Sequence, residues 1–143
     1  MILTEQIRLK TQGNCDIIDI AAQVEKKVAE SKITSGIVTV FVSGSTAGVT
    51  TMEYESGLVS DFKNLWQRLV PNNIQYGHDS AWGDGNGHAH IRASLLGCSL
   101  SIPITEGKMT LGTWQQIVLV DFDNRPRTRN VIIHIVGDSN TRK

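Results

Sequence analysis

The sequence shows no excess of charge of either sign. Fourteen basic residues balance fourteen acidic ones, so the formal net charge at pH 7 is zero with the histidines neutral. Proteins that bind nucleic acids or anionic membranes do so mainly through basic patches that displace counterions. We therefore expect neither a nucleic acid nor a membrane as a partner. A neutral surface also provides little repulsion between copies, which permits self-association.

Cysteine and long hydrophobic runs are also scarce. The chain has two cysteines, Cys15 and Cys98, without CxxC or similar paired spacing. This pattern indicates neither a disulfide framework nor a thiolate metal site, and we expect both thiols to be reduced and structural. No apolar stretch reaches the roughly 18 residues that a membrane span needs. The N-terminal segment MILTEQIRLK carries charges inside any apolar signal core, so we expect a cytoplasmic location.

What the chain does contain is the composition of an ordinary globular domain. It has 143 residues, of which 40% are hydrophobic and 20% charged. A chain of this size buries roughly 70% of the surface that it exposes when unfolded, and it corresponds to the most common domain size. We therefore expect a single domain over residues 1–143.

Hydrophobic periodicity divides the chain into strands and helices. Strands are expected at residues 3–9, 37–42, 99–104, 109–122 and 131–136, and helices from residue 14 or 16 to about 32, over 58–69 and over about 89–96. The last strands follow one another without helices between them, so the expected class is α+β with a mostly antiparallel sheet and two to three helices. The linking segment Asp123–Arg129 contains three alternating arginines, which could clamp a phosphate but more simply indicate an exposed loop.

Three of the four histidines lie in the segment HDSAWGDGNGHAH, residues 78–90. Imidazole nitrogens and carboxylate oxygens are common ligands of divalent metals and common proton carriers near neutral pH. If the segment is extended, His88 and His90 point the same way, and His78 supplies a third nitrogen across the glycine-rich turn. Asp79 and Asp84 could be ligands, acceptors that orient the imidazoles, or turn formers.

A second polar segment, SGSTAGVTT, follows the expected central strand. Its hydroxyls and backbone amides could hold an anion, although it lacks the lysine of a Walker loop; a hydroxyl-rich strand end is the alternative. Glu53 and Glu55 come next and face opposite ways if extended, so only one should reach a pocket, as a ligand or general base. His134 stands among apolar residues, and we interpret it as a strand residue at a sheet face or subunit contact.

Three longer segments resemble those of a known family. STAGVTTMEYE, YGHDSAWGDGNGHAHIRASLLG and SIPITEGKMTLGTWQQIVLVDF are closely similar to the YjbQ family, whose members are described as secondary thiamine-phosphate synthases. The resemblance runs from about Gly36 to Gly137. The family usually has T-x-N-E where this chain has Thr50-Thr51-Met52-Glu53, so Met52 replaces the asparagine and Glu53 is retained.

The resemblance implies a sheet curled into a sandwich or barrel-like shape and a homotrimer with pockets near the subunit interfaces. The shared polar residues, position by position, are Thr46, Glu53, His78, Asp84, His88, His90, Gly112, Thr113, Trp114 and Gln115. The implied reaction joins a pyrimidine pyrophosphate to a thiazole phosphate and releases pyrophosphate.

We therefore expect a site for a small phosphorylated molecule. His78, His88 and His90 are the expected ligands of a divalent metal, zinc or magnesium, with Glu53, Asp84 or His78 in catalysis. Residues expected to bind substrate are Ser45, Thr46, Thr50 and Gln115. A metal-dependent hydrolase of a small phosphorylated or carbonyl compound, and a non-catalytic metal- or anion-binding module, remain open alternatives.

Overall fold

A computed structural model describes residues 1–139, which form eight strands and four helices. In chain order these are β1 (Ile2–Thr11), β2 (Asp16–Asp19), α1 (Ala21–Ser31), β3 (Ser35–Ser43), β4 (Ala47–Met52), α2 (Ser56–Leu69), α3 (Gly77–Trp82), α4 (Gly87–Leu96), β5 (Ser99–Thr105), β6 (Lys108–Met109), β7 (Gln116–Asp121) and β8 (Arg127–Asp138). The α+β class predicted from the sequence is confirmed.

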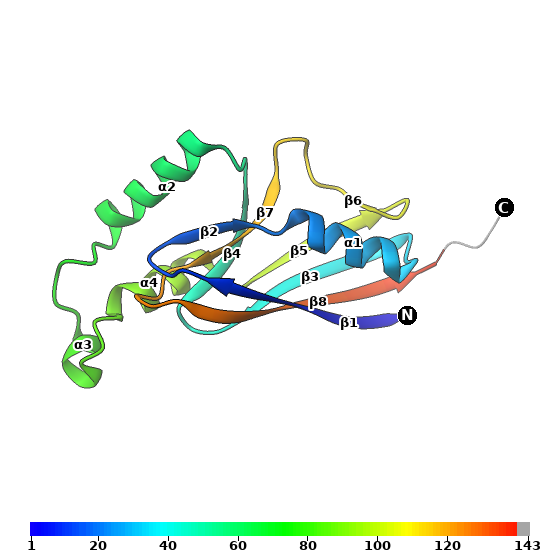
Figure 1. Ribbon diagram of the computed structural model, residues 1–143. Coiled ribbons are helices and arrows are strands. Elements are labelled where there is room, and N and C mark those ends of the chain that lie inside the picture. Colours follow the sequence, from blue (N-terminus) through cyan, green and yellow to red (C-terminus); the bar gives the residue numbers. More distant parts are fainter. Residues whose placement is uncertain (140–143) are drawn as a thin grey trace.

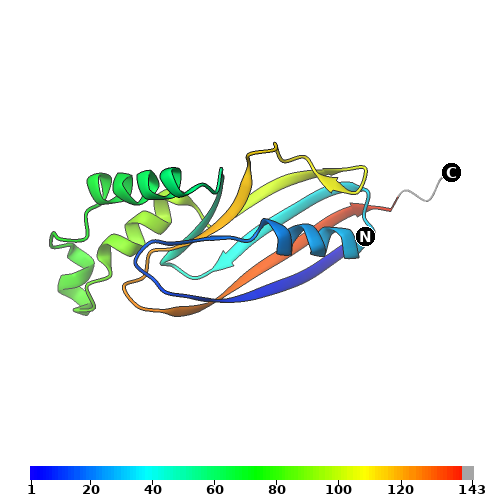
Figure 2. The same ribbon diagram turned by 45° about the horizontal axis from the view of Figure 1, so that its top comes forward.

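The strands form two sheets, and every described pair of strands is antiparallel. The order is β1-β8-β3-β5-β6 in the larger sheet and β2-β7-β4 in the smaller one. Figures 1 and 2 show that the sheets curl into a half-barrel, with α1 along the sheet and α2, α3 and α4 grouped at the end away from both termini. This arrangement agrees with the curled sheet that the family resemblance implies.

Strand β7 separates two hydrophobic cores. Ile117 and Leu119 belong to the core inside the half-barrel, which α1 covers with Ile20, Val24 and Val28. The alternate residues of β7 face the opposite way and pack under α2 and α4, in a cluster of Val118, Val120, Phe122, Trp66, Ala89 and Ala93. A strand buried on both faces is apolar along its length, and in β7 this holds from Ile117 to Val120. Each fully buried aliphatic side chain stabilises the fold by roughly 1.5–3 kcal/mol.

The predicted helix from residue 14 or 16 to 32 is wrong in its first part. Residues 16–19 pair with β7 as strand β2, and the helix starts only at Ala21. Ile17 and Ile18 suit a helical stripe, but pairing with a buried strand satisfies their backbone groups as well. The strand expected over 109–122 is also shorter, because only Lys108–Met109 and Gln116–Asp121 form ladders.

Two further expectations change. The described residues contain four helices rather than two or three, because the glycine-rich histidine segment forms α3 and starts α4. The segment at 123–129 is an exposed loop only at its centre, where Arg125 and Pro126 are exposed, whereas Asp123 and Arg129 are buried and β8 already begins at Arg127. Charged groups that pair inside the fold carry no apolar signal, so the pattern alone indicated a solvated segment.

His134 lies where the sequence predicts, on the outer face of the larger sheet. Its Nδ1 is 2.9 Å from the Thr4 hydroxyl on the neighbouring strand β1. Of the helices within residues 1–139, none has the length and apolar character to cross a bilayer.

Strands β3 and β8 approach most closely where Gly36 faces Gly137. A Cβ on Gly36 would lie 2.1 Å from the Val136 carbonyl oxygen. We expect Gly36→Ala to lower the free energy of unfolding by about 1–3 kcal/mol, because the backbone must shift to admit the methyl group. Gly77→Ala is the matched control, since its Cβ would meet nothing within 4 Å. Chemical denaturation measures both, and equal stabilities would contradict this account.

Candidate functional site

His88 and His90 lie on helix α4 rather than on an extended segment. Residues two apart on a helix point roughly 200° from each other. The expectation that the two rings point the same way is therefore wrong for this chain. His88 faces the protein interior and is 5% exposed, whereas His90 is only partly buried and lines a surface pocket.

His78 and His90 do come together. Helix α3 places the His78 ring against the His90 ring, with the centroids 4.3 Å apart and the planes tilted by 41°. The His78 Nδ1 is 3.5 Å from Asp84 Oδ1. This nitrogen is shielded from solvent and has no hydrogen bond within residues 1–139. A shielded polar atom without a partner favours a ligand or a closer contact with Asp84.

Asp79 has a structural role. Its Oδ2 accepts a hydrogen bond from the Tyr76 backbone N–H at the start of α3, and its Oδ1 accepts one from the Gly87 N–H at the start of α4. Carboxylates at helix N-termini satisfy backbone donors that lack partners within the helix. Asp79 therefore holds the two histidine-bearing helices together and is less free than Asp84 to bind a ligand.

His88 is set apart from this pair by its surroundings. Burial lowers the pKa of His88, and the nearby Arg92 guanidinium lowers it further, while Asp79 and Asp123 act in the opposite direction. The ring therefore stays neutral near pH 7. His88 is thus a buried residue that takes no part in the ring contact between His78 and His90.

Only some of the residues predicted as metal ligands lie close enough together to bind one divalent cation. Within residues 1–139, one group of potential metal ligands has donor atoms within 4.8 Å of one another, and it consists of His78, Asp79 and Asp84. His90 packs on this group through His78. His88, which the sequence placed among the ligands, lies outside the group. A metal site here would use His78 and Asp84, with His90 beside them.

The hydroxyl-rich loop lies across a pocket from His90. A pocket of about 260 Å³ is lined by Gly44, Ser45 and Ala47 on one side and by His90, Ala93, Ser94, Gly97 and Cys98 on the other. Ser45 is exposed, as a substrate contact requires. Thr46 is 5% exposed, and its hydroxyl is already engaged in the interior.

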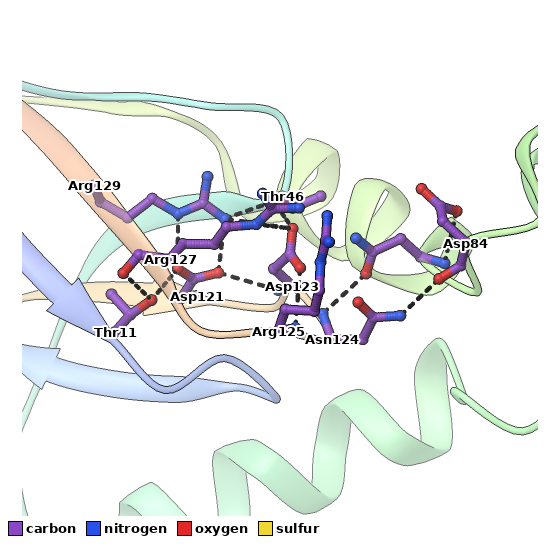
Figure 3. A network of polar contacts seen from close by, with 10 residues as sticks. Thr11, Thr46, Asp84, Asp121, Asp123, Asn124, Arg125, Arg127 and Arg129 are labelled. Carbon is purple, nitrogen blue, oxygen red and sulfur yellow. Dashed lines mark hydrogen bonds and ion pairs between the residues drawn. The ribbon is translucent and has the colours of Figure 1, made fainter.

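Figure 3 shows the network in which Thr46 takes part. The Arg129 Nε and Nη2 donate to the two carboxylate oxygens of Asp121 at 2.7 and 2.8 Å, and Nη2 also donates to the Thr46 hydroxyl at 2.6 Å. Thr11 donates to Asp121 from strand β1. The network therefore joins β1, β7, β8 and the loop before β4 at one end of the half-barrel.

Asp123 extends the network toward the histidines. It accepts hydrogen bonds from the Thr46 hydroxyl and the Arg125 N–H, and it pairs with Arg127 at 3.0 Å. The next residue, Asn124, donates its backbone N–H to Asn86 Oδ1 and its side-chain amide to the Asp84 carbonyl oxygen. The segment after β7 thus fixes the loop that carries Asp84.

The sequence reasoning missed Asp121, Asp123, Asn86 and Arg129 as residues that build the site. The three alternating arginines were considered as a phosphate clamp and interpreted as a solvated loop. Arg129 is 7% exposed and ion-paired, so that interpretation is wrong for this residue. One signal in the sequence could have indicated that Arg129 is buried. Arg129 lies two residues before Val131 in β8, and residues two apart in a strand point to the same face.

The remaining predicted residues lie elsewhere. Glu53 is exposed beyond the far end of β4, whose six residues span about 20 Å at roughly 3.3 Å per residue. The Gln115 side-chain amide donates to the hydroxyl of Thr51 in β4, and Thr50, the preceding residue of β4, is half-buried. In both views the loop before β7 is well separated from α3 (Figures 1 and 2). Within one chain, these residues do not join the histidines.

Glu55 also has a structural explanation. Its carboxylate accepts hydrogen bonds from the Gly57 and Leu58 N–H groups and caps α2. These bonds hold the pKa of Glu55 below its ordinary value. Of the two glutamates that the sequence offered, Glu53 is the one left for a function.

The fold, with His78 and His90 at the helical end of the sheet, defines a class of α+β half-barrel proteins. Comparison with known proteins identifies the family. A family model described as UPF0047 protein YjbQ-like matches residues 5–138, so the chain belongs to the YjbQ family. A UPF0047 protein from Archaeoglobus fulgidus is 42% identical over 128 residues, which cover 90% of this chain and 97% of that protein. The UPF0047 protein YugU from Bacillus subtilis is 32% identical and is covered along 100% of its length by 94% of this chain.

Solved structures agree with this assignment. A YbjQ-like protein of unknown function from Sulfolobus solfataricus superposes with a TM-score of 0.92 at 33% identity, covering 96% of this chain and 99% of that one. An uncharacterized conserved protein of the YjbQ/UPF0047 family from Clostridium acetobutylicum has a TM-score of 0.84 at 38% identity, covering 92% and 99%.

Asp123 makes the stability of the fold depend on pH. Burial raises its pKa, but hydrogen bonds from Thr46 and Asn86 and the pairing with Arg127 outweigh burial, and the pKa lies below its ordinary value. A lowered pKa in the folded state adds stability above the unfolded value near 4, and this stability is lost as the pH falls through the folded value. Asp123→Asn should remove that part of the pH dependence.

Asp123→Asn should also cost about 2–4 kcal/mol at neutral pH, because it weakens the hydrogen bond from the buried Thr46 hydroxyl and removes the charge that pairs with Arg127. Urea unfolding between pH 7 and pH 3 measures both effects. Asp61→Asn, at an exposed position of α2, is the matched control and should retain the wild-type curve. A parallel shift of the two variants would contradict the role assigned to Asp123.

Proposed function

We propose that this protein is an enzyme that acts on a small phosphorylated molecule at the end of the half-barrel. The observation that carries the proposal is the arrangement of His78, Asp84 and His90 beside the pocket that Gly44 and Ser45 line. Groups able to transfer protons or hold a cation thus lie next to a loop able to hold an anion. The departure of a phosphate or pyrophosphate leaving group is favoured by such groups, because they offset its negative charge.

His78 and Asp84 form the reactive pair in this proposal. With Nδ1 toward the carboxylate, Asp84 would orient the ring, and Nε2 would exchange a proton with substrate or water. His90 packs on the same ring and lines the pocket, so it would contact the substrate directly.

A divalent cation, zinc or magnesium, fits the same residues. The shielded His78 Nδ1 lacks a partner within the described part of the chain, and a carboxylate oxygen of Asp84 lies 3.5 Å away. The cation, when bound, would supply neutralisation of the negative charge on a phosphate or pyrophosphate group. Asn86 holds the Asp84 carboxylate in place. Its backbone N–H donates to Asp84 Oδ1, and its own Oδ1 accepts a hydrogen bond from the Asn124 N–H in the segment after β7.

The reaction that we propose is the formation of thiamine phosphate. A thiazole phosphate attacks a pyrimidine pyrophosphate through its ring nitrogen, a C–N bond forms, and the C–O bond to pyrophosphate breaks with its electron pair on the leaving group. The resemblance of the histidine and GTWQ segments to the YjbQ family supports this reaction. The leaving group carries several negative charges, which a cation beside an anion-holding loop would offset.

Replacing the paired histidines tests the site. We expect His78→Ala and His90→Ala each to lower thiamine-phosphate formation by about 100-fold or more, since each loses a group that touches substrate or cation. Tightly bound zinc, measured by mass spectrometry, should fall from one ion per chain to a small fraction. His134→Ala, on the outer sheet face, is the matched control and should retain both properties.

The outcomes separate the candidate functions. Hydrolysis of a phosphate ester without thiamine-phosphate formation would identify a hydrolase instead. Metal binding without turnover of either kind would indicate a non-catalytic binding module. Wild-type activity and metal content in both His78→Ala and His90→Ala would refute the site itself.

We also propose that the protein is a homotrimer. Two different apolar surfaces support this: the outer face of the larger sheet exposes Ile2, Ile37, Phe41 and Val136, and the helical end exposes Leu65, Leu69, Ile91 and Leu95. Ile2, Val136 and Ile37 lie in one row across β1, β8 and β3. A cyclic trimer uses two different surfaces of each copy, unlike a two-fold dimer. Such a ring could bring Glu53 and Gln115 of one copy to the histidines of the next.

Light scattering tests the assembly. We expect a solution mass three times the chain mass of 15.7 kDa. Phe41→Asp should shift the protein toward monomers, because it buries a carboxylate in the interface without a partner. Gln23→Glu, on an exposed residue of α1, which packs on the inner side of the half-barrel, should leave the mass unchanged. A wild-type monomer at micromolar concentration would exclude the trimer.

A further inference from the structure

The loop that joins β3 to β4 carries backbone donors without acceptors. The N–H groups of Gly44, Ser45 and Thr46 make no hydrogen bond within residues 1–139. The flanking amides are bonded: Val42 donates to the Cys98 carbonyl oxygen and Val49 to that of Gly97. Consecutive free N–H groups in a bend are a common way to bind an anion.

A buried cation lies behind the same loop. Arg129 uses Nε and Nη2 for Asp121 and Thr46, whereas Nη1 has no hydrogen-bond partner in the described part of the chain. Figure 3 shows one terminal nitrogen of Arg129 pointing away from the dashed contacts. Arg129 is 7% exposed as a whole, and Nη1 is not among the buried polar atoms of residues 1–139 that lack a partner, so this nitrogen is the part of the guanidinium that reaches the surface and can donate to a ligand.

The free nitrogen adjoins the loop at Gly44. A Cβ built on Gly44 would lie 2.5 Å from the Arg129 Nη1, and the guanidinium carbon is the other atom within 4 Å outside the adjacent residues. The φ angle of Gly44 is 146°, a conformation that other residues rarely adopt. Glycine here lets the guanidinium lie directly against the loop backbone, because Nη1 occupies the place that a Cβ would take. Gly44 and Ser45 also line the 260 Å³ pocket that His90 borders, and no carboxylate lines that pocket.

We propose that Arg129 and the Gly44–Thr46 loop form a phosphate-binding subsite. The Nη1 of Arg129 would bind one phosphate oxygen, and the loop amides and the Ser45 hydroxyl would bind the others. This assigns the anion contact to a residue that the sequence placed in a solvated loop. The Thr46 hydroxyl is not a direct ligand, because it already donates to Asp123 and accepts from Arg129, and Thr46 contributes only its backbone N–H.

The surrounding charges favour an added anion only weakly. Arg127 and Arg129 balance the carboxylates of Asp123 and Asp121, so the network is neutral before binding. Affinity must then come from directed hydrogen bonds rather than from net positive charge, and we expect dissociation constants in the millimolar to high micromolar range. Arg129 is held by Asp121, so little side-chain freedom is lost on binding.

This subsite deepens the proposed function, on which it rests for its physiological ligand, but it can be tested without catalysis. Binding of inorganic phosphate and of a simple phosphomonoester is measured by ³¹P NMR or calorimetry, with a chelator present to keep metals from the histidines. Phosphate binding by a protein without enzymatic activity would support the subsite and refute the proposed reaction. Failure of the subsite is therefore distinguishable from failure of the proposed function.

The decisive variant is Ser45→Asp, because Ser45 is exposed and makes no hydrogen bond in the described structure. A carboxylate there should weaken phosphate binding by about tenfold or more through like-charge repulsion and competition for the loop amides. Ser60→Asp, at an exposed position of α2, adds the same charge as a control and should bind phosphate like the wild type. Equal binding by Ser45→Asp and wild type would overturn the subsite.

Arg129→Lys tests the cation itself. Lysine keeps a positive charge but cannot contact Asp121 with two nitrogens and still offer a third to a ligand. We expect about tenfold weaker phosphate binding from a folded variant, checked by circular dichroism. If this variant does not fold, Ser45→Asp decides the question alone. Wild-type phosphate affinity in a folded Arg129→Lys would remove Arg129 from the subsite.

Discussion

The buried ion pair between Arg129 and Asp121 is the interaction on which the site depends. Taking two charges out of water costs several kcal/mol per ion, and the pair offsets this only when the remaining donors and acceptors are also satisfied. Here the Thr11 hydroxyl and the backbone N–H of Asp123 donate further hydrogen bonds to the Asp121 carboxylate, while the Thr46 hydroxyl accepts one from Arg129. Because the partners come from β1, β7, β8 and the β3–β4 loop, the charges fix how the two sheets meet at this end.

The polar end follows from the alternation of β7. Ile117 and Leu119 point into the half-barrel, and Asp121 is the next residue on that face, where the apolar interior ends. Asp123 continues past the strand and turns toward the helices, where Asn124 contacts Asn86 and the Asp84 carbonyl. One short segment thereby sets the distance between the anion-holding loop and the histidine pair. Rigid support of this kind is what positions reacting groups accurately.

The sequence predicted the features that depend on apolar periodicity. Helix α2, helix α4, the central strand and the final strand follow from it, because burial of a repeating apolar face determines each. It failed where polar contacts decide the structure. His88 and His90 were interpreted as extended because metal-binding HxH segments often are, but Asp79 caps the Gly87 N–H and starts a helix there. The sequence gives no signal for a carboxylate eight residues away that stabilises a helix start, nor for the pairing of Arg129 with Asp121.

The distribution of polar residues along β4 explains why the predicted site divides into two parts. Thr46 precedes the strand at the histidine end, and Glu53 follows it at the end where Gln115 contacts Thr51. A strand is too stiff to bring its ends together, so a single chain presents two separate polar regions. The residues that this chain shares with its family come from both polar regions. A shared sequence motif does not tell whether two residues meet within one chain or between two copies. In a head-to-tail ring, the region of one copy that contains Glu53 would face a different region of its neighbour, as heterologous contact requires. The sequence motifs would then describe one site made by two chains, and the fold of each chain needs to supply only half of it.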